Sequence, residues 1–487
     1  MSPVTVLITI VCYFALLITV SWLAGRKADN AGFFSGNRQS NWLLVAMSTI
    51  GAPISAVTFV SVPGMVAGAG MSYMQMVLGF LVGQIIIAYV LIPLYYKMNL
   101  TSIYEYLDRR FGLASYKTGA WFFFLSKSTG AAVRLFIVCT VLQLLLFAPL
   151  GVPFWANVLL TMLVVYLFTF KGGVKSVVWT DLLKTLCLLL SVILCIVFIL
   201  RAGVGFDGYG ESAMTKMFFF DDLNDPRFFW KQFLAGVFVV IATTGLDQDM
   251  MQRTLSCRNY RDSQKNLIVG ASVQTVVIFL FLVLGWLLYM FAAKEGIALT
   301  GADGVALKGD DVFPFLATGN WFPAVVGVLF VVGFIAAGNS AAGSALTALT
   351  TSFTIDILDR TPDKQSEQAI RRTRSIVHIA MALLMAAMIY VVYLLNDDSV
   401  IQTVYKVASY TYGPLLGLFF FGIFSKRRVR DRWVPLVCIL APVLTLILDM
   451  NSVAWFAGYT FSHERLILNA LFTVAGLYCL VRNNNNQ

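Results

Sequence analysis

The chain has 487 residues, of which 59% are hydrophobic and only 12% are charged. An ordinary soluble domain carries about 25% charged residues, so this composition excludes a soluble domain and indicates an all-α polytopic membrane protein. The net charge of +10 does not indicate nucleic-acid binding, because the basic residues lie mainly between apolar stretches. Seven scattered cysteines and two histidines form no zinc, haem or cluster motif, and no catalytic constellation is present, so an enzyme is not expected.

Thirteen apolar stretches are long enough to cross a membrane as helices, which requires roughly 20 residues each. The stretches are residues 3–25, 41–64, 72–97, 119–148, 153–170, 176–201, 229–250, 266–293, 321–353, 375–396, 400–424, 433–450 and 465–481. No large soluble domain fits between them, so the lipid bilayer is the expected environment and no obligatory protein partner is indicated.

Basic residues are distributed unevenly over the segments between these stretches. If the stretches alternate from an outside N-terminus, 24 of the 35 Lys and Arg residues fall on one side. Cytoplasmic loops of membrane proteins carry such an excess. The sequence therefore predicts a bacterial-type cytoplasmic membrane protein with its N-terminus outside and its C-terminus in the cytoplasm.

The second stretch contains Pro53, two residues after Gly51. Proline removes a backbone donor and clashes with the carbonyl four residues earlier, and glycine weakens the same turn. Carbonyls freed at mid-membrane depth are tolerated only where they are buried in protein or line a cavity. The sequence thus predicts a broken helix at Pro53 with a binding site beside it.

The seventh stretch loses its apolar character at residues 241–249, where hydroxyls, Gly245, Asp247 and Gln248 interrupt it. A second helix break that takes part in gating is expected there. This break occupies the position that matches Pro53 if the chain contains two inverted repeats, an arrangement found in secondary transporters.

The topology supports such a repeat, because five stretches after the first begin on the cytoplasmic side and the next five begin outside. The sequence predicts one transporter domain over residues 1–487. Its parts are a leading helix and loop (1–40), a first repeat (41–202), a second repeat (229–424) and two trailing helices with a tail (433–487).

Small and hydroxyl-bearing residues share one face of the ninth stretch, namely Ala337, Ser340, Ser344 and Thr347. A hard monovalent cation prefers several oxygen ligands, which these hydroxyls and the carbonyls beside Pro53 would supply. The alternative is that the hydroxyls bond their own backbone or a neighbouring helix.

Asp181, near the start of the sixth stretch, is a second candidate cation ligand, because an acid within a membrane helix usually faces a polar interior. An interfacial carboxylate paired with Lys175 or Lys184 is an equally good interpretation.

Lys127 and Arg134 lie seven residues apart on the fourth stretch and hence on one helical face. A buried guanidinium is suited to a carboxylate or another oxyanion, because it is planar, permanently charged and bidentate. An internal ion pair with Asp247 or Asp249 would explain these basic residues equally well.

Six motifs in order resemble the sodium/solute symporter family, which includes sodium-coupled sugar, sialic acid, proline, vitamin and iodide carriers. The motifs are residues 31–38 (AGFFSGNR), 101–107 (TSIYEYL), 172–181 with GG and VWTD, 247–253 (DQDMMQR), 336–347 (AAGNSAAGSALT) and 412–417 (YGPLLG). The resemblance covers nearly the whole chain. It implies a five-plus-five inverted-repeat core and transport by alternating access that is driven by sodium.

The resemblance also implies a sodium site made by backbone oxygens of Gly51, Ile54 and Ala337 and by the hydroxyl of Ser340. Family members usually have a second Ser or Thr after that serine, whereas this chain has Ala341, so one ligand is missing.

Members with a second sodium site use an acid that resembles Asp181 and hydroxyls that resemble Ser344. Gly343 replaces a further hydroxyl of that site in this chain.

For the solute, similarity to the sialic acid carriers extends over residues 54–63 and implies that Ser55, Thr58 and Phe59 contact the substrate. Phe238 matches an aromatic wall position. The carboxylate-binding arginine of those carriers aligns nearer Ala132 than Arg134.

The sequence therefore predicts a sodium-coupled symporter that carries a small polar organic solute, such as a sugar, sugar acid or other organic anion, into the cell by alternating access. A passive facilitator or ion channel of the same membrane is the alternative. The identity of the solute does not follow from the sequence.

Overall fold

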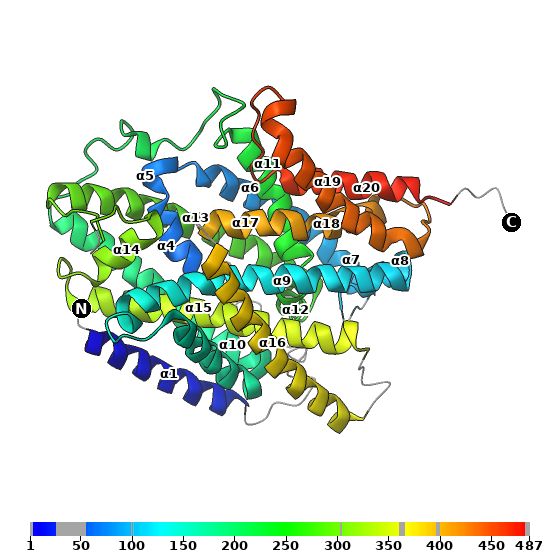
Figure 1. Ribbon diagram of the computed structural model, residues 1–487, viewed down its shortest axis with the longest axis horizontal. Helices are drawn as coiled ribbons and strands as arrows, with labels where there is room; N and C mark the ends of the chain where they lie inside the picture. Colours follow the sequence, from blue (N-terminus) through cyan, green and yellow to red (C-terminus); the bar gives the residue numbers. More distant parts are fainter. Residues whose placement is uncertain are drawn as a thin grey trace.

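The computed structural model describes residues 3–25, 55–98, 100, 102–301, 304–359, 366–395 and 400–482 (Figure 1). The side chains of residues 3, 17, 18, 20–25, 171–184, 400 and 401 lie outside this description. Gly51, Pro53 and Ile54 also lie outside the described residues. The interruption predicted at Pro53 therefore stays a prediction.

Helices account for the regular structure of the described residues, which contain no strand beyond two isolated bridges. The helices are α1 (Pro3–Gly25), α4 (Ala56–Gly64), α5 (Val66–Ala69), α6 (Tyr73–Ile86), η2 (Ile87–Leu91), α7 (Ile92–Met98), α8 (Glu105–Arg110), α9 (Leu113–Leu142), η3 (Gln143–Phe147), α10 (Phe154–Arg201), η4 (Ala213–Thr215), α11 (Phe229–Val240), η5 (Ile241–Gly245), α12 (Gln248–Thr254), α13 (Tyr260–Lys294), α14 (Gly309–Thr318), α15 (Ala324–Ser352), η6 (Phe353–Ile357), α16 (Glu367–Leu395), α17 (Val400–Thr411), α18 (Gly413–Phe424), η7 (Asp431–Trp433), α19 (Val434–Trp455) and α20 (Arg465–Cys479).

Within the described part of the chain, six helical segments are long and apolar enough to cross a membrane, or eight if each of two bent pairs is one span. Four shorter apolar helices coincide with further predicted stretches. Large apolar side chains point outward on several of them; Met450 of α19, for example, is 78% exposed. An apolar surface of this extent suits a bilayer, so the protein is a multi-pass membrane protein.

The two bent pairs differ in how well the sequence anticipates them. The segments Phe229–Gly245 and Gln248–Thr254 meet at 73°, at the place where hydroxyls and acids interrupt the seventh stretch. The segments Gln402–Thr411 and Gly413–Phe424 meet at 48°, within a stretch predicted to be one continuous helix. Pro414 at the first turn of α18 explains this second bend, because proline cannot donate the backbone bond that would continue α17.

Helix α15 packs against both the N-terminal and the C-terminal part of α10. Its Gly333 packs against Leu188, and a Cβ atom at its Gly343 would lie only 2.4 Å from Cζ of Phe168. The predicted stretches 153–170 and 176–201 thus flank the same helix, although they fall within one helical element, α10. Ser340 and Ser344 of α15 border a space that residues of α9 and α12 also line.

The ends of α10 and α13 define one end of the bundle, where Lys294 Nζ donates to the Ala202 carbonyl at 3.0 Å. Residues 202–228, 295–301 and 304–308 lie between helices there, and we call it the long-loop end. The ends of α7 and α12 meet at the opposite end, where the Tyr96 hydroxyl donates to the Cys257 carbonyl at 3.0 Å.

Candidate binding site

Hydrogen bonds from neighbouring segments stabilise the bend between η5 and α12. Tyr95 donates its hydroxyl to the Gly245 carbonyl and Tyr104 donates to the Leu246 carbonyl, each at 2.9 Å. Gln248 accepts a hydrogen bond from the Ile103 backbone N–H at 2.9 Å. Because these partners satisfy the backbone groups that the bend frees, the interruption is a stable feature of the fold.

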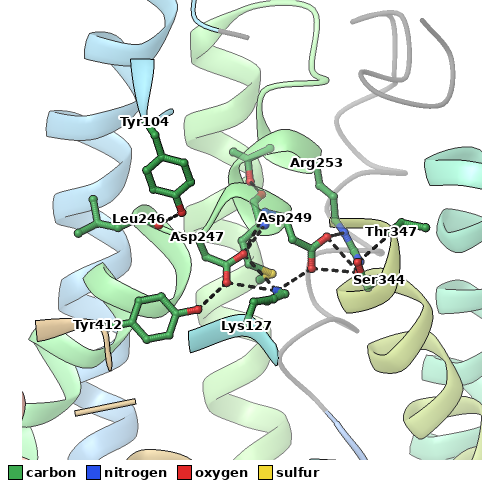
Figure 2. Close-up of polar contacts among 11 residues, drawn as sticks. Tyr104, Lys127, Leu246, Asp247, Asp249, Arg253, Ser344, Thr347 and Tyr412 are labelled. Carbon is green, nitrogen blue, oxygen red and sulfur yellow. Dashed lines mark hydrogen bonds and ion pairs between the residues drawn. The ribbon is translucent and has the colours of Figure 1, made fainter. Parts of the chain in front are cut away.

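The bend places two carboxylates beside one ammonium group. Lys127 Nζ of α9 lies 3.1 and 3.2 Å from the two carboxylate oxygens of Asp247 and 2.9 Å from Oδ2 of Asp249 (Figure 2). Asp247 also caps α12, since it accepts from the backbone N–H groups of Asp249 and Met250. The side chains of Lys127, Asp247 and Asp249 are only 9%, 3% and 11% exposed, so these ion pairs are shielded from water.

Further donors join this cluster to other helices. Tyr412 donates to Asp247 at 2.7 Å, Ser344 of α15 lies 3.0 Å from both oxygens of Asp249, and Arg253 Nε lies 3.3 Å from Asp249 (Figure 2). The broken helix is therefore tied to α9, α15 and the α17–α18 bend at one point.

A central cavity of about 120 Å³ lies beside this cluster. Its wall combines apolar side chains with hydroxyls, amides and charged groups. The residues are Thr58, Tyr73, Phe80, Gln84, Ser126, Lys127, Gly130, Arg134, Val239, Val240, Thr243, Thr244, Asp247, Met250, Gln274, Ile278, Val404, Tyr405, Ala408 and Tyr412. A concave pocket on which polar groups converge is the usual form of a solute site.

Arg134 is the one basic residue of this wall for which no hydrogen bond or ion pair exists among the described residues. Lys127, seven residues earlier, is fully engaged with Asp247 and Asp249. The sequence left open whether these residues form an internal ion pair or face a solute. Lys127 forms the internal ion pair, and Arg134 faces the cavity.

Among the described residues of the cluster and the cavity walls, basic side chains outnumber acidic ones. Lys127, Arg134 and Arg253 contribute three cations, whereas Asp247 and Asp249 contribute two carboxylates. Arg134 is partly buried and has no partner among the described residues, so an anion that entered the cavity would be stabilised beside its guanidinium.

Several cavity residues are absent from the sequence-based prediction. Oε1 of Gln84 is buried and has no hydrogen-bond partner within the described part of the chain. The hydroxyls of Tyr73 and Tyr405 lie 2.5 Å apart at the edge of the cavity toward the long-loop end. Gln84 could have been found from the sequence, because an amide within an apolar stretch usually faces a polar interior. The contact between Tyr73 and Tyr405 could not, because the two residues are 332 positions apart in the chain.

Of the predicted solute contacts, Thr58 and Arg134 line the central cavity and three others do not. Phe59 is fully buried in a cluster of aromatic rings with Phe281, Phe313 and Phe330. Phe59 points into the core, one position away from the helical face of Thr58, and does not border the central cavity.

Phe238 packs as a partly buried core residue, while Val239 and Val240 of the same helix form the wall. Ser55 is buried at the start of α4, where its carbonyl accepts from the Phe59 N–H at 3.1 Å. Neither side chain borders the central cavity.

A side cavity of about 40 Å³ lies between α9, α12 and α15. The residues of its wall are Lys127, Ala131, Arg134, Leu135, Asp249, Met250, Arg253, Ser340, Ala341, Ala342, Ser344 and Ala345. It shares Lys127, Arg134 and Met250 with the central cavity, so the two spaces adjoin.

The predicted sodium ligands of α15 lie at or near this side cavity. Ser340 and Ser344 are part of its wall, and Ala337 is fully buried one turn before Ser340. The side chain of Asp181, like Gly51 and Ile54, lies outside the description. Ser344 already donates to Asp249, and the close contact of Gly343 with Phe168 leaves no room for a hydroxyl at position 343.

A third cavity of about 1120 Å³ lies at the long-loop end, next to Gln402, one helical turn from Tyr405. Its wall includes Asp225, Arg227 and Asp311. Hydrogen bonding to Arg227 lowers the pKa of Asp225, whereas burial and the neighbouring Asp310 raise the pKa of Asp311. We call this space the mouth cavity.

A membrane protein whose broken helices surround a buried polar cavity is built as a secondary transporter. The family model described as the sodium:solute symporter family matches residues 33–431. The chain therefore belongs to the sodium:solute symporter family. It is a sodium-coupled symporter for a small-molecule solute and not an enzyme.

Individual relatives agree with this assignment. A sodium/sialic acid symporter of Aliivibrio fischeri is 26% identical over 466 residues, which cover 90% of this chain and 86% of that protein. The human sodium/iodide cotransporter is 25% identical over 432 residues, 84% of this chain and 65% of that protein. The fold is similar to the solved structure of a Na⁺-coupled sialic acid symporter in a substrate-bound outward-open state, with a TM-score of 0.82, 18% identity and 97% coverage of both chains.

Proposed function

We propose that the transported solute is a compact organic anion whose anionic group binds Arg134 in the central cavity. The observation that carries this proposal is the Arg134 guanidinium, which borders the cavity and has no partner within the described part of the chain. An arginine fork binds a carboxylate through two parallel hydrogen bonds, and burial strengthens that interaction.

The relatives support an anionic solute, since sialic acid and iodide, named for two of them, are both anions. The cavity volume of about 120 Å³ is below the 300–1,000 Å³ that is typical of larger ligand sites. A short carboxylate therefore suits this cavity better than an extended sugar. Gln84, Thr58 and Gln274 would bind the polar groups at its other end.

Sodium binds on the Ser340 face of α15, and solute and sodium each stabilise the arrangement that the other requires. In this proposal the long-loop end faces outside, and the mouth cavity is the entrance. The excess of basic residues at the opposite end supports this orientation, in which the N-terminus is outside and the membrane is a bacterial cytoplasmic membrane.

Uptake by proteoliposomes tests the proposed solute class. The panel contains lactate, pyruvate, gluconate and sialic acid as anions and galactose as a neutral sugar. Removal of one partner of a buried charge pair costs about 2–5 kcal/mol, so Arg134→Ala should raise the KM for the transported anion at least 30-fold. Arg134→Lys should recover part of that loss, because it keeps the charge but not the fork.

Lys406→Ala is the matched control, since Lys406 is an exposed basic residue of α17 that borders neither cavity. It should leave the KM within about twofold of the wild-type value. An unchanged KM in Arg134→Ala, or transport of galactose in preference to every anion, would refute an anionic solute held by Arg134.

A further inference from the structure

The segment between α18 and α19, residues 425–433, carries a dense group of basic side chains. Lys426, Arg427, Arg428, Arg430 and Arg432 are all exposed. None of them has an ion-pair partner within the described part of the chain. Like charges this close together repel one another, so an anion at this surface would be stabilised.

Backbone hydrogen bonds hold this segment against the end of α20. The Arg430 N–H donates to the Leu480 carbonyl at 3.0 Å. The Arg482 N–H donates to the Arg428 carbonyl, also at 3.0 Å. Val429 lies between these bonds and is only 5% exposed. Because alternate side chains of an extended segment point to opposite faces, Arg428 and Arg430 point away from the core on either side of Val429.

Asp431, the one acid of this segment, is directed into the protein. Its carboxylate accepts from the backbone N–H groups of Ala114 and Ser115, each at 2.9 Å, and from the Ser115 hydroxyl at 2.6 Å. These bonds join the segment to the first turn of α9. The exposed residues that alternate with Val429 and Asp431 are Arg428, Arg430 and Arg432, which we call the arginine row.

The arginine row lies at the end of the bundle opposite the mouth cavity. Helix α9 begins beside Asp431 and contains, near its other end, Thr140 of the mouth cavity wall. Trp433 directly follows the row and is 42% exposed, and Leu436 and Ile439 on the next turns of α19 are exposed as well. Because tryptophan is enriched at membrane interfaces, the row is placed at the level of the lipid head groups, next to side chains that face acyl chains.

We propose that the arginine row binds the head group of an anionic phospholipid, whose acyl chains lie along α18 and α19. These two helices pack against each other, and Phe420, Phe424 and Leu440 add to their exposed apolar surface. A guanidinium binds a phosphate through two parallel hydrogen bonds, so three arginines suit this head group better than three lysines would. A soluble anion would use the charge of the row but not the apolar surface beside it.

A second group of exposed basic residues at the same end provides a matched control. Arg258, Arg261 and Lys265 follow Cys257 at the start of α13. If basic residues at this end act only through the general attraction between positive loops and a negative membrane surface, both groups contribute equally. A lipid site at the arginine row makes the two groups unequal.

Native mass spectrometry of the purified full-length protein in a non-ionic detergent measures the Kd of the tightest bound lipid. The probes are dioleoyl phosphatidylglycerol, which is anionic, and dioleoyl phosphatidylcholine, which has the same chains and no net charge. The wild-type protein should bind phosphatidylglycerol at least tenfold more tightly than phosphatidylcholine. Glycerol 3-phosphate at millimolar concentration should not compete, because it lacks the acyl chains.

One basic side chain at an anionic surface changes affinity about fivefold, so the combined Arg428→Gln, Arg430→Gln and Arg432→Gln variant should bind phosphatidylglycerol at least tenfold more weakly. The same three residues changed to Lys should recover part of that loss. The combined Arg258→Gln, Arg261→Gln and Lys265→Gln variant should keep its Kd within about twofold of the wild-type value.

A measurement on the wild-type protein decides the question even if the glutamine variant fails to fold. Phosphatidylglycerol with a photoreactive diazirine in its acyl chain should crosslink to residues 420–440. Crosslinks that all lie elsewhere, or equal affinity for the two lipids, would overturn the proposal. It would also be overturned by equal losses of affinity in the two glutamine variants, or by full competition from glycerol 3-phosphate, which would indicate a site for a soluble phosphate.

Discussion

Lys127 provides the most direct test of the buried charge cluster, because it neutralises two carboxylates at once. Lys127→Met keeps the length and much of the volume of the side chain but leaves Asp247 and Asp249 without their shared counterion. Removal of one partner from a buried ion pair typically costs about 3–5 kcal/mol. The three side chains are at most 11% exposed, so the cost is not relieved by solvent screening.

The expected change in melting temperature follows from the size of the protein. An unfolding entropy of about 2.1 cal/mol/K per residue corresponds to roughly 1 kcal/mol/K for 487 residues. Lys127→Met should therefore lower Tm by about 3–5 °C in a thermal-shift assay of detergent-solubilised protein. Addition of Asp247→Asn should restore at least 1 °C of that loss, because it removes the carboxylate that has no other ion-pair partner, whereas Asp249 keeps Arg253.

Lys216→Met is the control for this measurement, since Lys216 pairs with Asp221 at 3.3 Å but the two side chains are 50% and 85% exposed. An exposed pair contributes little, so its Tm should stay within about 1 °C of the wild-type value. A Lys127→Met variant that melts with the wild-type protein would refute the assignment of Lys127 as the counterion of both carboxylates.

Three further substitutions test separate parts of the structure. Gly343→Ala should lower Tm by about 1–3 °C, because its Cβ would lie 2.4 Å from Phe168 Cζ and overpacking costs about 1–3 kcal/mol. Tyr405→Phe removes the hydrogen bond to Tyr73, so a thiol reagent should modify a cysteine placed in the central cavity at least threefold faster. Burial, with a smaller contribution from Arg465, lowers the pKa of His463 from 6.5 to about 4, so the unfolded state binds the proton first and stability falls as pH drops through this range. His463→Gln should therefore flatten the decrease of Tm between pH 6.5 and 4.5.

Each of these predictions has an outcome that would contradict it. For the glycine, the control is Gly130→Ala, where a new Cβ meets nothing within 4 Å; equal Tm values for the two variants would remove the steric argument. For the tyrosine pair, equal modification rates would show that it does not limit access to the cavity. For His463, a pH profile that parallels the wild-type profile would show that another group titrates.

Backbone chemistry made one helix break predictable from the sequence. The bend near Gly245 coincides with a change from apolar residues to hydroxyls and acids, a local signal that needs no tertiary information. Its supports were not predictable, because Tyr95 and Tyr104 donate to carbonyls about 150 positions away. The bend before Pro414 was missed, although proline marks the position, because the apolar run continues on both sides.

The sequence indicated which residues belong to the site, but not which way their side chains point. Helical spacing indicated that Lys127 and Arg134 share a face, yet only the positions of Asp247 and Asp249 decide that the first is paired and the second faces the cavity. For Phe59, similarity over residues 54–63 indicated a solute contact, whereas the packing of three phenylalanine rings around it places it in the core. Neighbours along a helix differ by about 100° in direction, so a motif match does not determine which of them faces a cavity.

The central claim is that this symporter uses a sodium gradient to accumulate an organic anion. The most direct measurement is uptake of radiolabelled anion into proteoliposomes with an inward sodium gradient, compared with an equal choline gradient. The claim predicts accumulation above the external concentration only with sodium, and a reduction of at least tenfold in Ser340→Ala. Equal uptake in sodium and choline, unaffected by Ser340→Ala, would contradict it.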